Sequence, residues 1–341
     1  MSAGRRSRSS SAIAAALVAL AASAASARAD RVEEARFVTV GGIEQWVTIR
    51  GADRTNPILL VLHGGPAEVQ SPLAPEYAPF ERDFVVVQWD QRGSGKTFVR
   101  AGAAAQPTSV DLLVGDAIEL TQLLTKTLPS KDVVLLGHSW GSFLGVRIVK
   151  QRPDLFRAFV GTGQVVSWDR AAAIQYRHAL ARARAQPNPE AVKALEALGP
   201  PPPGDFDKYG AMRKWLFPYF AAADLDWVKK LGDLMRARLA ATPEAFKAYA
   251  EGYENTMKGV GSAITSTNLP ALGTDFKVPF FVIQGRDDMI TPTELVAEYV
   301  AQIRAPAKRL TVIDGAGHFV AMTHTAAFVA ALREDLALAR R

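Results

Sequence analysis

Apolar and polar positions follow two different periods along this chain. Short, almost continuously apolar runs occur at residues 58–62, 84–89, 133–136, 158–160, 279–283 and 310–313. Strands that are covered on both faces have this pattern. Apolar residues at helical spacing occur at residues 111–128, 142–150 and 326–339. Strand and helix patterns that alternate in this way predict an α/β fold, with a mostly parallel sheet and helices on both of its faces.

Two local patterns add a hairpin and a helix start to this prediction. Residues 37–40 and 43–49 are rich in β-branched and aromatic residues and are joined by Gly41 and Gly42, which predicts a β-hairpin. Thr291 and Glu294 have the spacing of a capping box, which predicts a helix with Thr291 as its N-cap.

The strand pattern stops between residues 165 and 268, where the sequence is alanine-rich and helical in its spacing. One apolar stripe, which we expect to pack against the rest of the protein, consists of Val228, Leu231, Leu234, Met235 and Leu239. We predict a helical lid at residues 165–268. It is inserted between a first part of the core at 30–164 and a second part at 269–341.

The first 29 residues have the three parts of a secretory signal peptide. Three arginines precede an apolar run at residues 13–25, and Ala27-Arg28-Ala29 has the small-x-small form of a cleavage site. The apolar run is shorter than the roughly 20 residues that a membrane-spanning helix needs. A disordered or anchoring N-terminus is the alternative. The pattern predicts a secreted or periplasmic protein with no membrane span after cleavage.

Removal of the signal peptide would change the charge of the chain. Residues 1–29 hold four arginines and no acid, so the 40 basic and 34 acidic residues of the sequence become 36 and 34. This near balance gives no reason to expect nucleic acid as a partner. The sequence has no cysteine, which excludes disulfides, thiolate metal sites and a cysteine nucleophile. We expect neither a metal nor a cofactor.

A serine flanked by glycines, Ser139, stands at the end of a predicted strand. The motif Gly137-His138-Ser139-Trp140-Gly141 follows the apolar run 133–136 and precedes a predicted helix. This is the G-x-S-x-G pattern in the strand–turn–helix context of a nucleophile elbow. The turn is tight and exposes the serine hydroxyl, so side chains in place of the two glycines would collide with neighbouring backbone. Ser139 is therefore the predicted nucleophile.

A serine hydroxyl needs a base to take its proton and an acid to orient that base. In folds with this elbow, the acid and then the histidine follow the serine along the chain. His318 comes after the last strand and is the predicted base, with His324 as the alternative. Asp288 follows the preceding strand at Gly-x-x-Asp spacing and is the predicted acid. Asp287 is the alternative acid, and Asp314 is expected to be structural.

Backbone N–H groups have to stabilise the negative oxygen of a tetrahedral intermediate. The N–H of Trp140, directly after the nucleophile, is one predicted donor. The second is expected from His63-Gly64-Gly65-Pro66, in the loop after the strand at 58–62. Pro66 has no N–H to donate. Gly65 is the predicted residue and Gly64 is the alternative.

The stretch at residues 89–97, Trp-Asp-Gln-Arg-Gly-Ser-Gly-Lys-Thr, partly matches a phosphate-binding loop. Residues 95–97 fit the second half of the pattern G-x-x-x-x-G-K-[ST], but Asp90 occupies the position of its first glycine. A carboxylate there would face the charge of the phosphate. We therefore expect no nucleotide site, and we expect Asp90 and Arg92 to hold the loop in shape.

Five motifs together make the chain similar to a known family. They are His63-Gly64-Gly65-Pro66, Trp89-Asp90-Gln91-Arg92-Gly93-Ser94-Gly95, Gly137-His138-Ser139-Trp140-Gly141, Gly285-Arg286-Asp287-Asp288 and Gly315-Ala316-Gly317-His318. In these motifs the chain resembles the proline iminopeptidases of the α/β-hydrolase superfamily, over residues 35–162 and 270–340. The resemblance implies an α/β-hydrolase fold with an inserted helical lid, in which residues 89–97 lie near the entrance of the site.

The lid is where the chain departs from that family. The resemblance implies that lid carboxylates hold the free amino group of the substrate, but the tryptophan–glutamate motif of the family's lid is not recognisable here. Glu251 and Glu254 are the candidates for this role, with solvated helix charges as the alternative interpretation. The glycine that follows His-Gly-Gly-Pro in the family is replaced by Ala67.

These patterns predict a serine hydrolase that works through an acyl-enzyme. The resemblance implies an enzyme like proline iminopeptidase, which releases N-terminal proline or another residue from short peptides. A carboxylesterase, or another acyl hydrolase that acts on a small ester, is the alternative. Haloalkane dehalogenases and epoxide hydrolases are disfavoured because they use an aspartate where Ser139 stands. A binding module on an inactive scaffold is disfavoured because each role in the triad has a candidate residue.

Overall fold

The structure is a computed structural model that describes residues 30–102, 108–186, 188–239 and 243–339. The signal peptide predicted for residues 1–29 lies outside these ranges. Among the described helices, none combines the length and the apolar character that a membrane crossing requires.

The described chain forms one eight-stranded sheet with the strand order β1-β2-β4-β3-β5-β6-β7-β8. The strands are β1 (Val32–Val40), β2 (Ile43–Gly51), β3 (Ile58–Leu62), β4 (Val85–Trp89), β5 (Val133–His138), β6 (Ala158–Thr162), β7 (Phe280–Gly285) and β8 (Lys308–Ile313). The pairs β1–β2 and β2–β4 are antiparallel, and all other neighbouring strands are parallel. The predicted fold class, a mostly parallel sheet within an α/β fold, is confirmed.

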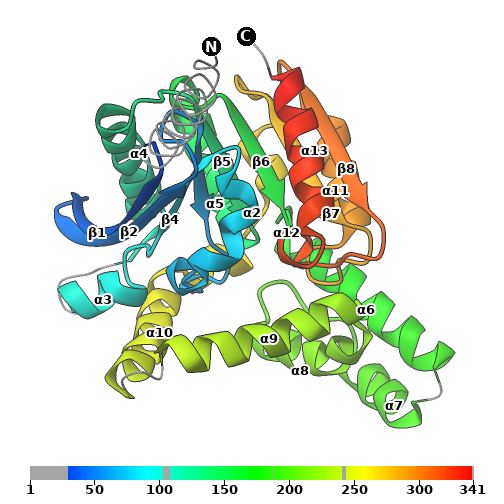
Figure 1. Cartoon of the computed structure of the whole chain (residues 1–341). Helices are drawn as coiled ribbons and strands as arrows, with labels where there is room; N and C mark the ends of the chain where they lie inside the picture. The colour runs from blue at the N-terminus through cyan, green and yellow to red at the C-terminus, as the bar shows by residue number, and fades with distance from the viewer. Residues whose placement is uncertain (1–29, 103–107, 187, 240–242, 340–341) are drawn as a thin grey trace, which may run out of the picture.

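Helices cover both faces of the sheet (Figure 1). Ile58 and Leu60 of β3 belong to one apolar cluster, whereas Leu59 and Val61 belong to another, because successive side chains of a strand point to opposite faces. The helices of the first cluster are α4 (Val110–Thr127), α5 (Trp140–Gln151) and α11 (Thr293–Gln302). Those of the second cluster are α2 (Ala78–Glu81), α12 (Val320–Thr323) and α13 (Thr325–Leu338).

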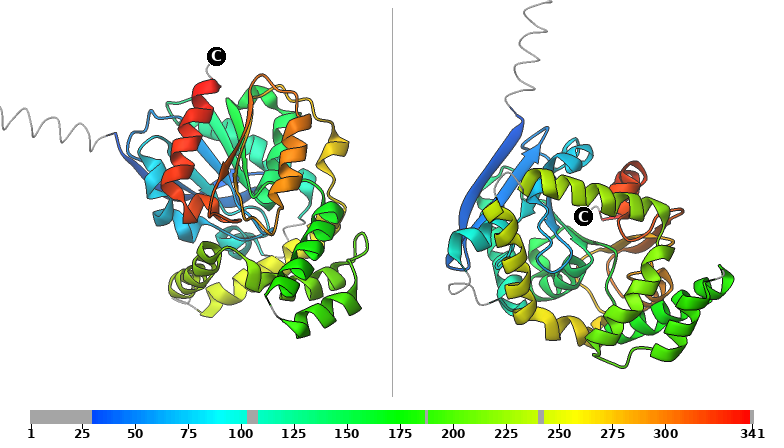
Figure 2. Two further views of the ribbon diagram at one scale, coloured as in Figure 1. Left: turned by 90° about the vertical axis from the view of Figure 1, so that its right-hand side faces the viewer. Right: turned by 90° about the horizontal axis from the view of Figure 1, so that it is seen from below.

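The segment between β6 and β7 is helical and gathers at one end of the sheet (lower part of Figure 1; Figure 2, right). Its helices are α6 (Trp168–Ala185), α7 (Pro189–Leu198), α8 (Phe206–Leu216), α9 (Ala222–Leu239) and α10 (Pro243–Thr265), with the short η4 (Phe217–Tyr219). All lie within the range 165–268 that was predicted as a lid. Leu195, Met212 and Leu216 form an apolar cluster of their own, and Met289 from the loop after β7 packs into it.

Three local features differ from the sequence prediction. The hairpin strands are longer, because β1 and β2 pair all the way to Val32 and Gly51. The prediction of a capping box with Thr291 as N-cap was wrong, since α11 begins at Thr293 with Pro292 as its N-cap. The Thr291 hydroxyl donates a hydrogen bond to Asp288 instead. The short helices were not predicted: η1 (Ser71–Tyr77), α2, α3 (Gly95–Ala101), η3 (Pro153–Leu155), η4, η5 (Leu269–Leu272) and α12.

The loop after β4 is held by Asp90 and Arg92, as expected. Arg92 donates hydrogen bonds of 2.8 and 3.0 Å to the buried carboxylate of Asp116. Oδ2 of Asp90 accepts a 2.9 Å hydrogen bond from the backbone N–H of Lys96, in the first turn of α3. Burial raises the pKa of Asp90 to about 6. A helix N-terminus favours negative charge, and here the chain's own carboxylate lies where a phosphate would bind.

Candidate active site

Ser139 lies in the sharp turn between β5 and α5 and has a left-handed backbone conformation, with φ = 52°. Such a conformation is strained for a residue with a side chain and occurs mainly where the surrounding structure enforces it. A Cβ on Gly141 would lie 2.1 Å from the carbonyl oxygen of Leu62, and one on Gly137 would lie 2.5 Å from that of Gly141. The two flanking glycines are therefore required by close backbone approach, as predicted for a nucleophile elbow.

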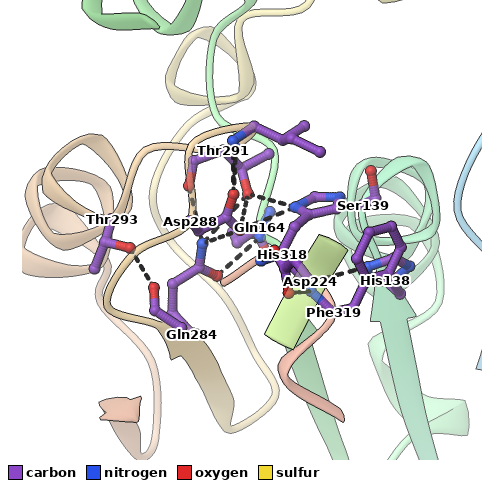
Figure 3. A network of polar contacts seen from close by, with 12 residues as sticks. His138, Ser139, Gln164, Asp224, Gln284, Asp288, Thr291, Thr293, His318 and Phe319 are labelled. Atoms are coloured by element: carbon purple, nitrogen blue, oxygen red, sulfur yellow. Dashed lines mark hydrogen bonds and ion pairs between the residues drawn. The ribbon is translucent and has the colours of Figure 1, made fainter. Parts of the chain in front are cut away.

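The structure brings Ser139, Asp288 and His318 together at the end of the sheet that the lid covers (Figure 3). They follow β5, β7 and β8, and the carboxyl ends of parallel strands meet at the same edge of a sheet. Nδ1 of His318 lies 2.9 Å from Oδ2 of Asp288. Figure 3 shows Ser139 beside the imidazole of His318. No hydrogen bond joins these two described side chains, and such bonds are often long in sites without substrate.

Asp288 is held by several donors in addition to His318. Its Oδ1 accepts 2.8 Å hydrogen bonds from the backbone N–H groups of Ile290 and Thr291. Its Oδ2 accepts from the Thr291 hydroxyl at 2.7 Å and from the Gln284 amide at 2.8 Å. Asp287, the alternative acid, is exposed. The structure thus places Asp288, and not Asp287, against the histidine.

Burial and neighbouring charges shift the pKa values of Asp288 and His318 in opposite directions. Burial by itself raises the pKa of Asp288, but the charge and hydrogen bond of His318 and the bonds from Thr291 outweigh it and leave the pKa below its ordinary value. Burial likewise lowers the pKa of His318, but the carboxylates of Asp288 and Asp224 raise it above the ordinary histidine value. The site therefore favours an ionised Asp288 and stabilises the imidazolium form of His318.

A residue of the lid, Asp224, contacts the backbone of the histidine loop. Asp224 is 2% exposed and belongs to α9. Its Oδ2 accepts a 2.5 Å hydrogen bond from the N–H of His318, and its Oδ1 accepts a 3.2 Å bond from the N–H of Phe319 (Figure 3). A Cβ on Gly317 would lie 2.1 Å from this carboxylate. Burial raises the pKa of Asp224, against the effect of these backbone bonds.

The predicted oxyanion donors lie next to the serine. The backbone N–H groups of Gly65 and Trp140 donate no hydrogen bond within the described chain, and both residues line the same cavity as Ser139. Gly65 has a φ of 108° and precedes a cis peptide bond to Pro66, and Ala67 has a φ of 63°. Glycine fits the backbone at Gly65 because a side chain there would approach the N–H of Glu68 to 2.7 Å.

Two other histidines near the site, His63 and His138, are neutral and structural. Burial lowers the pKa of His63 to about 4 and that of His138 to about 3. Nδ1 of His63 lies 2.8 Å from the Gly64 carbonyl, and Nε2 of His138 lies 3.2 Å from the His318 carbonyl. His324 is the N-cap residue of α13 and its Nδ1 contacts Thr323 at 3.0 Å. Of the two predicted alternatives, His318 alone contacts the buried acid.

Two cavities adjoin the serine and the histidine loop. The first cavity, of about 190 Å³, is lined by Ser139, Gly65 and Trp140, by Arg213 of α8, and by aromatic residues of the lid. The second cavity, of about 270 Å³, is lined by Glu68 and His138 and by side chains of α9 and α10. The residues of the predicted apolar stripe on α9 that line the second cavity are Val228, Leu231 and Met235.

The structure does not bring Glu251 and Glu254 to the serine. Both are exposed on α10, and Glu251 lies 3.7 Å from Lys247 one turn earlier. The face of α10 that lines the first cavity carries Tyr253 and Met257 instead. Both glutamates thus have the surroundings of solvated helix charges, the alternative interpretation of their sequence.

Three residues at the site were missed by the sequence analysis. Gln284 precedes the acid motif, but a glutamine at a strand end has no distinctive pattern. Asp224 lies in a helical segment without a motif, 94 residues before the backbone that it binds. Glu68 directly follows the His-Gly-Gly-Pro-Ala stretch and is the one that could have been noticed from its position. In the described residues no cluster of three histidine, aspartate or glutamate side chains has a metal-binding arrangement.

The comparisons with known proteins agree with this fold. The family described as the alpha/beta hydrolase fold matches residues 57–325. This range is most of the chain, which therefore belongs to the α/β-hydrolase fold family.

Individual relatives resemble the chain at low identity. The probable aminopeptidase YbaC of Bacillus subtilis strain 168 is 26% identical over 285 residues, which is 82% of this chain and 89% of the relative. The crystal structure of a proline iminopeptidase-related protein from Thermus thermophilus has a TM-score of 0.63 at 23% identity, and covers 90% of this chain and 98% of that one. A thermophilic esterase from Thermogutta terrifontis has a TM-score of 0.59 at 18% identity, over 91% and 99%. The two structures share the fold of this chain.

Proposed function

We propose that this protein is a serine hydrolase of the aminopeptidase type, which removes the N-terminal residue from short peptides through an acyl-enzyme. One observation carries the proposal. Ser139 has a left-handed backbone at the end of β5, beside a histidine whose Nδ1 lies 2.9 Å from a buried, ionised aspartate. A nucleophile, its base and an orienting acid have this arrangement in enzymes that use a serine for acyl transfer.

In the proposed reaction, Oγ of Ser139 attacks the carbonyl carbon of the scissile bond and its proton passes to Nε2 of His318. Asp288 accepts the Nδ1–H of His318, which fixes the tautomer and stabilises the imidazolium. The N–H groups of Gly65 and Trp140 stabilise the negative oxygen of the tetrahedral intermediate. His318 then gives its proton to the leaving amine, and the acyl-enzyme ester remains.

Water resolves the acyl-enzyme in the second half of the reaction. His318 takes a proton from the water as its oxygen attacks the ester carbonyl, and it returns that proton to Oγ of Ser139 as the ester bond breaks. The products are a free acid and the regenerated serine. Every step uses side chains and backbone groups of the described chain.

The aminopeptidase class is supported by the relatives, because the matching Bacillus protein is named a probable aminopeptidase. Hydrolysis of a small ester is the second candidate. It is favoured by the largely apolar lining of the first cavity, which includes Trp140, Phe143 and Trp168, and by the esterase among the structural neighbours.

A fluorophosphonate probe tests the chemistry. We expect it to label Ser139 in the wild type and to leave Ser139→Ala unlabelled, with a loss of roughly 10⁴- to 10⁶-fold in kcat for that variant. Labelling of another serine would contradict the proposal. Prolyl 4-nitroanilide, its N-acetylated form and 4-nitrophenyl acetate then separate the classes. The aminopeptidase class requires the free amide to be hydrolysed much faster than the acetylated one, whereas turnover of the ester alone would support the esterase.

A further inference from the structure

Leaving histidine and tyrosine aside, each of the two cavities has one acidic or basic side chain among the described residues that line it, a basic one in the first and an acidic one in the second. Arg213 is the basic residue of the first cavity, and Glu68 is the acidic residue of the second. The remaining titratable side chains that line the second cavity are His138, Tyr77 and Tyr249. They are neutral at ordinary pH, because burial lowers the histidine pKa and raises the tyrosine pKa values.

Glu68 lies close to the nucleophile. A Cβ added to Gly64 would lie 3.2 Å from Oε2 of Glu68 and 3.3 Å from Cβ of Ser139. The distance between Oε2 of Glu68 and Cβ of Ser139 is therefore no greater than the sum of these two distances. In the N-terminal residue of a peptide, the amino nitrogen is two bonds away from the carbonyl carbon that the serine attacks. A carboxylate that binds this nitrogen has to lie within a few ångströms of the nucleophile, and Glu68 does.

The surroundings of Glu68 favour the binding of a cation. No described side chain forms a hydrogen bond or an ion pair with its carboxylate, and burial raises its pKa against the influence of His318. The neighbouring lining is apolar, with Trp227, Leu231 and Met235 from the lid. An ionised carboxylate in such a place is unfavourable unless a positive group pairs with it.

Arg213 is the corresponding basic side chain in the cavity that Ser139 lines. It belongs to α8 of the lid, and its guanidinium lies 5.8 Å from the ring centroid of Tyr209. No described carboxylate lies within ion-pair distance of it. Its positive charge repels the imidazolium form of His318 and acts to lower the pKa of His318. A guanidinium presents a planar fork of donors that matches a carboxylate.

We propose that Glu68 and Arg213 bind the two ends of a zwitterionic substrate, a free dipeptide or similarly short peptide. Glu68 binds the α-ammonium group of the residue that is released, and Arg213 binds the terminal carboxylate of the leaving group. The inference rests on the proposed peptidase function and narrows it to peptides with both termini free. It also gives the amino-terminal role to a residue of the loop after β3 rather than to α10.

Three peptides test this assignment: prolyl-alanine, N-acetyl-prolyl-alanine and prolyl-alaninamide, with release of alanine or alaninamide measured by chromatography. In the wild type we expect kcat/KM for the free dipeptide to exceed that for each blocked form by about 10- to 100-fold. This is the range that a hydrogen bond to a charged group contributes. Equal rates on all three would overturn the inference and leave the peptidase function standing. Hydrolysis of 4-nitrophenyl acetate without cleavage of any peptide would overturn the function itself.

Two variants test which residue binds which end of the substrate. Glu68→Gln should bring the ratio of free to N-acetylated substrate close to one and keep the ratio of free acid to amide. Arg213→Gln should do the reverse. Ratios within one variant cancel any general loss of catalytic power. If Glu68→Gln does not fold, Glu68→Asp, which withdraws the carboxylate by one methylene, should lower the same ratio.

Two exposed residues provide matched controls. Glu251→Gln on α10 and Lys214→Gln on α8 remove a charge of the same sign from exposed positions, and both ratios should stay at the wild-type value. Survival of either ratio in its own variant, Glu68→Gln or Arg213→Gln, would overturn the two-charge assignment.

Discussion

Two consecutive aspartates, Asp287 and Asp288, have opposite surroundings. Asp287 is exposed, whereas Asp288 is 3% exposed and accepts hydrogen bonds from four groups besides His318. Successive residues in a turn point in different directions, so a shift of one position exchanges a buried acid for a solvated one. The spacing Gly-x-x-Asp favoured Asp288 in the sequence, but only the fold places that residue against the imidazole.

Replacement of each aspartate by asparagine should separate the two. Asp288→Asn should reduce kcat by roughly 10⁴-fold, because the amide favours the wrong histidine tautomer, and Asp287→Asn should retain nearly full activity. The carboxylates raise the pKa of His318, and the base works only when neutral. Wild-type kcat/KM should therefore rise with pH through a midpoint above the ordinary histidine pKa. Loss of the Asp288 charge should move the midpoint of the residual activity to lower pH, and an unchanged midpoint would argue against the pairing.

The glycine at position 141 is a steric requirement that can be tested through stability. A Cβ there would lie 2.1 Å from the carbonyl oxygen of Leu62, and neither backbone segment can move away easily. Gly141→Ala should lower the free energy of unfolding by about 3 kcal/mol, at the upper end of overpacking costs. Gly210→Ala on α8 is the control, because no atom lies within 4 Å of its added Cβ. It should be neutral or stabilising in denaturant unfolding, and equal losses would contradict the steric argument.

At the scale of elements, the most informative contact joins a lid helix to a catalytic loop. Asp224 of α9 accepts the N–H groups of His318 and Phe319. On the other side of the site, the buried Gln175 of α6 donates to the Ile290 carbonyl at 2.5 Å, in the loop that carries Asp288. The lid therefore positions both the predicted base and the predicted acid in addition to covering the cavity.

Asp224→Asn should disturb the base more than substrate binding. The amide keeps one acceptor oxygen and brings an N–H₂ group towards backbone N–H donors, so kcat should fall by about 10-fold or more while KM changes little. Loss of the negative charge should also shift the midpoint of the pH profile to lower pH, since Asp224 raises the pKa of His318. Asp226→Asn, exposed on the same helix, is the control. A rise in KM at constant kcat would show that Asp224 acts on the substrate instead.

The sequence predicted those elements whose pattern is local. The apolar runs at β3, β4, β5 and β7 are strands because both faces of each are buried, and such a run is visible without tertiary information. The start of α11 was wrong because the Thr291 hydroxyl is used by Asp288, a contact that competes with capping. Asp224 and the partner-free Glu68 depend on segments far apart in the chain, which one sequence does not join.

At the scale of the whole molecule, we propose that the chain is exported and that residues 1–29 are removed. The basic, apolar and small-residue parts of that segment support the proposal. Expression of the full sequence in a Gram-negative host should give a periplasmic protein whose first residue is Asp30. Edman sequencing of the purified protein checks this, and replacement of Ala27 and Ala29 by bulky residues should leave an unprocessed chain. An intact N-terminus on the wild-type protein would contradict export by cleavage.

The hydrogen bonds between Asp224 and the histidine loop have a consequence for protein engineering and for divergence within the family. A lid segment is often regarded as an interchangeable module that sets specificity on a constant core. Here a transplanted lid would have to supply both a new binding surface and a carboxylate at the position of Asp224. Without it, the backbone N–H groups of His318 and Phe319 would lose their acceptor. Lid exchange in this protein should therefore succeed with donors that carry an acid at this position, and should otherwise give chimaeras that bind ligands but turn over slowly.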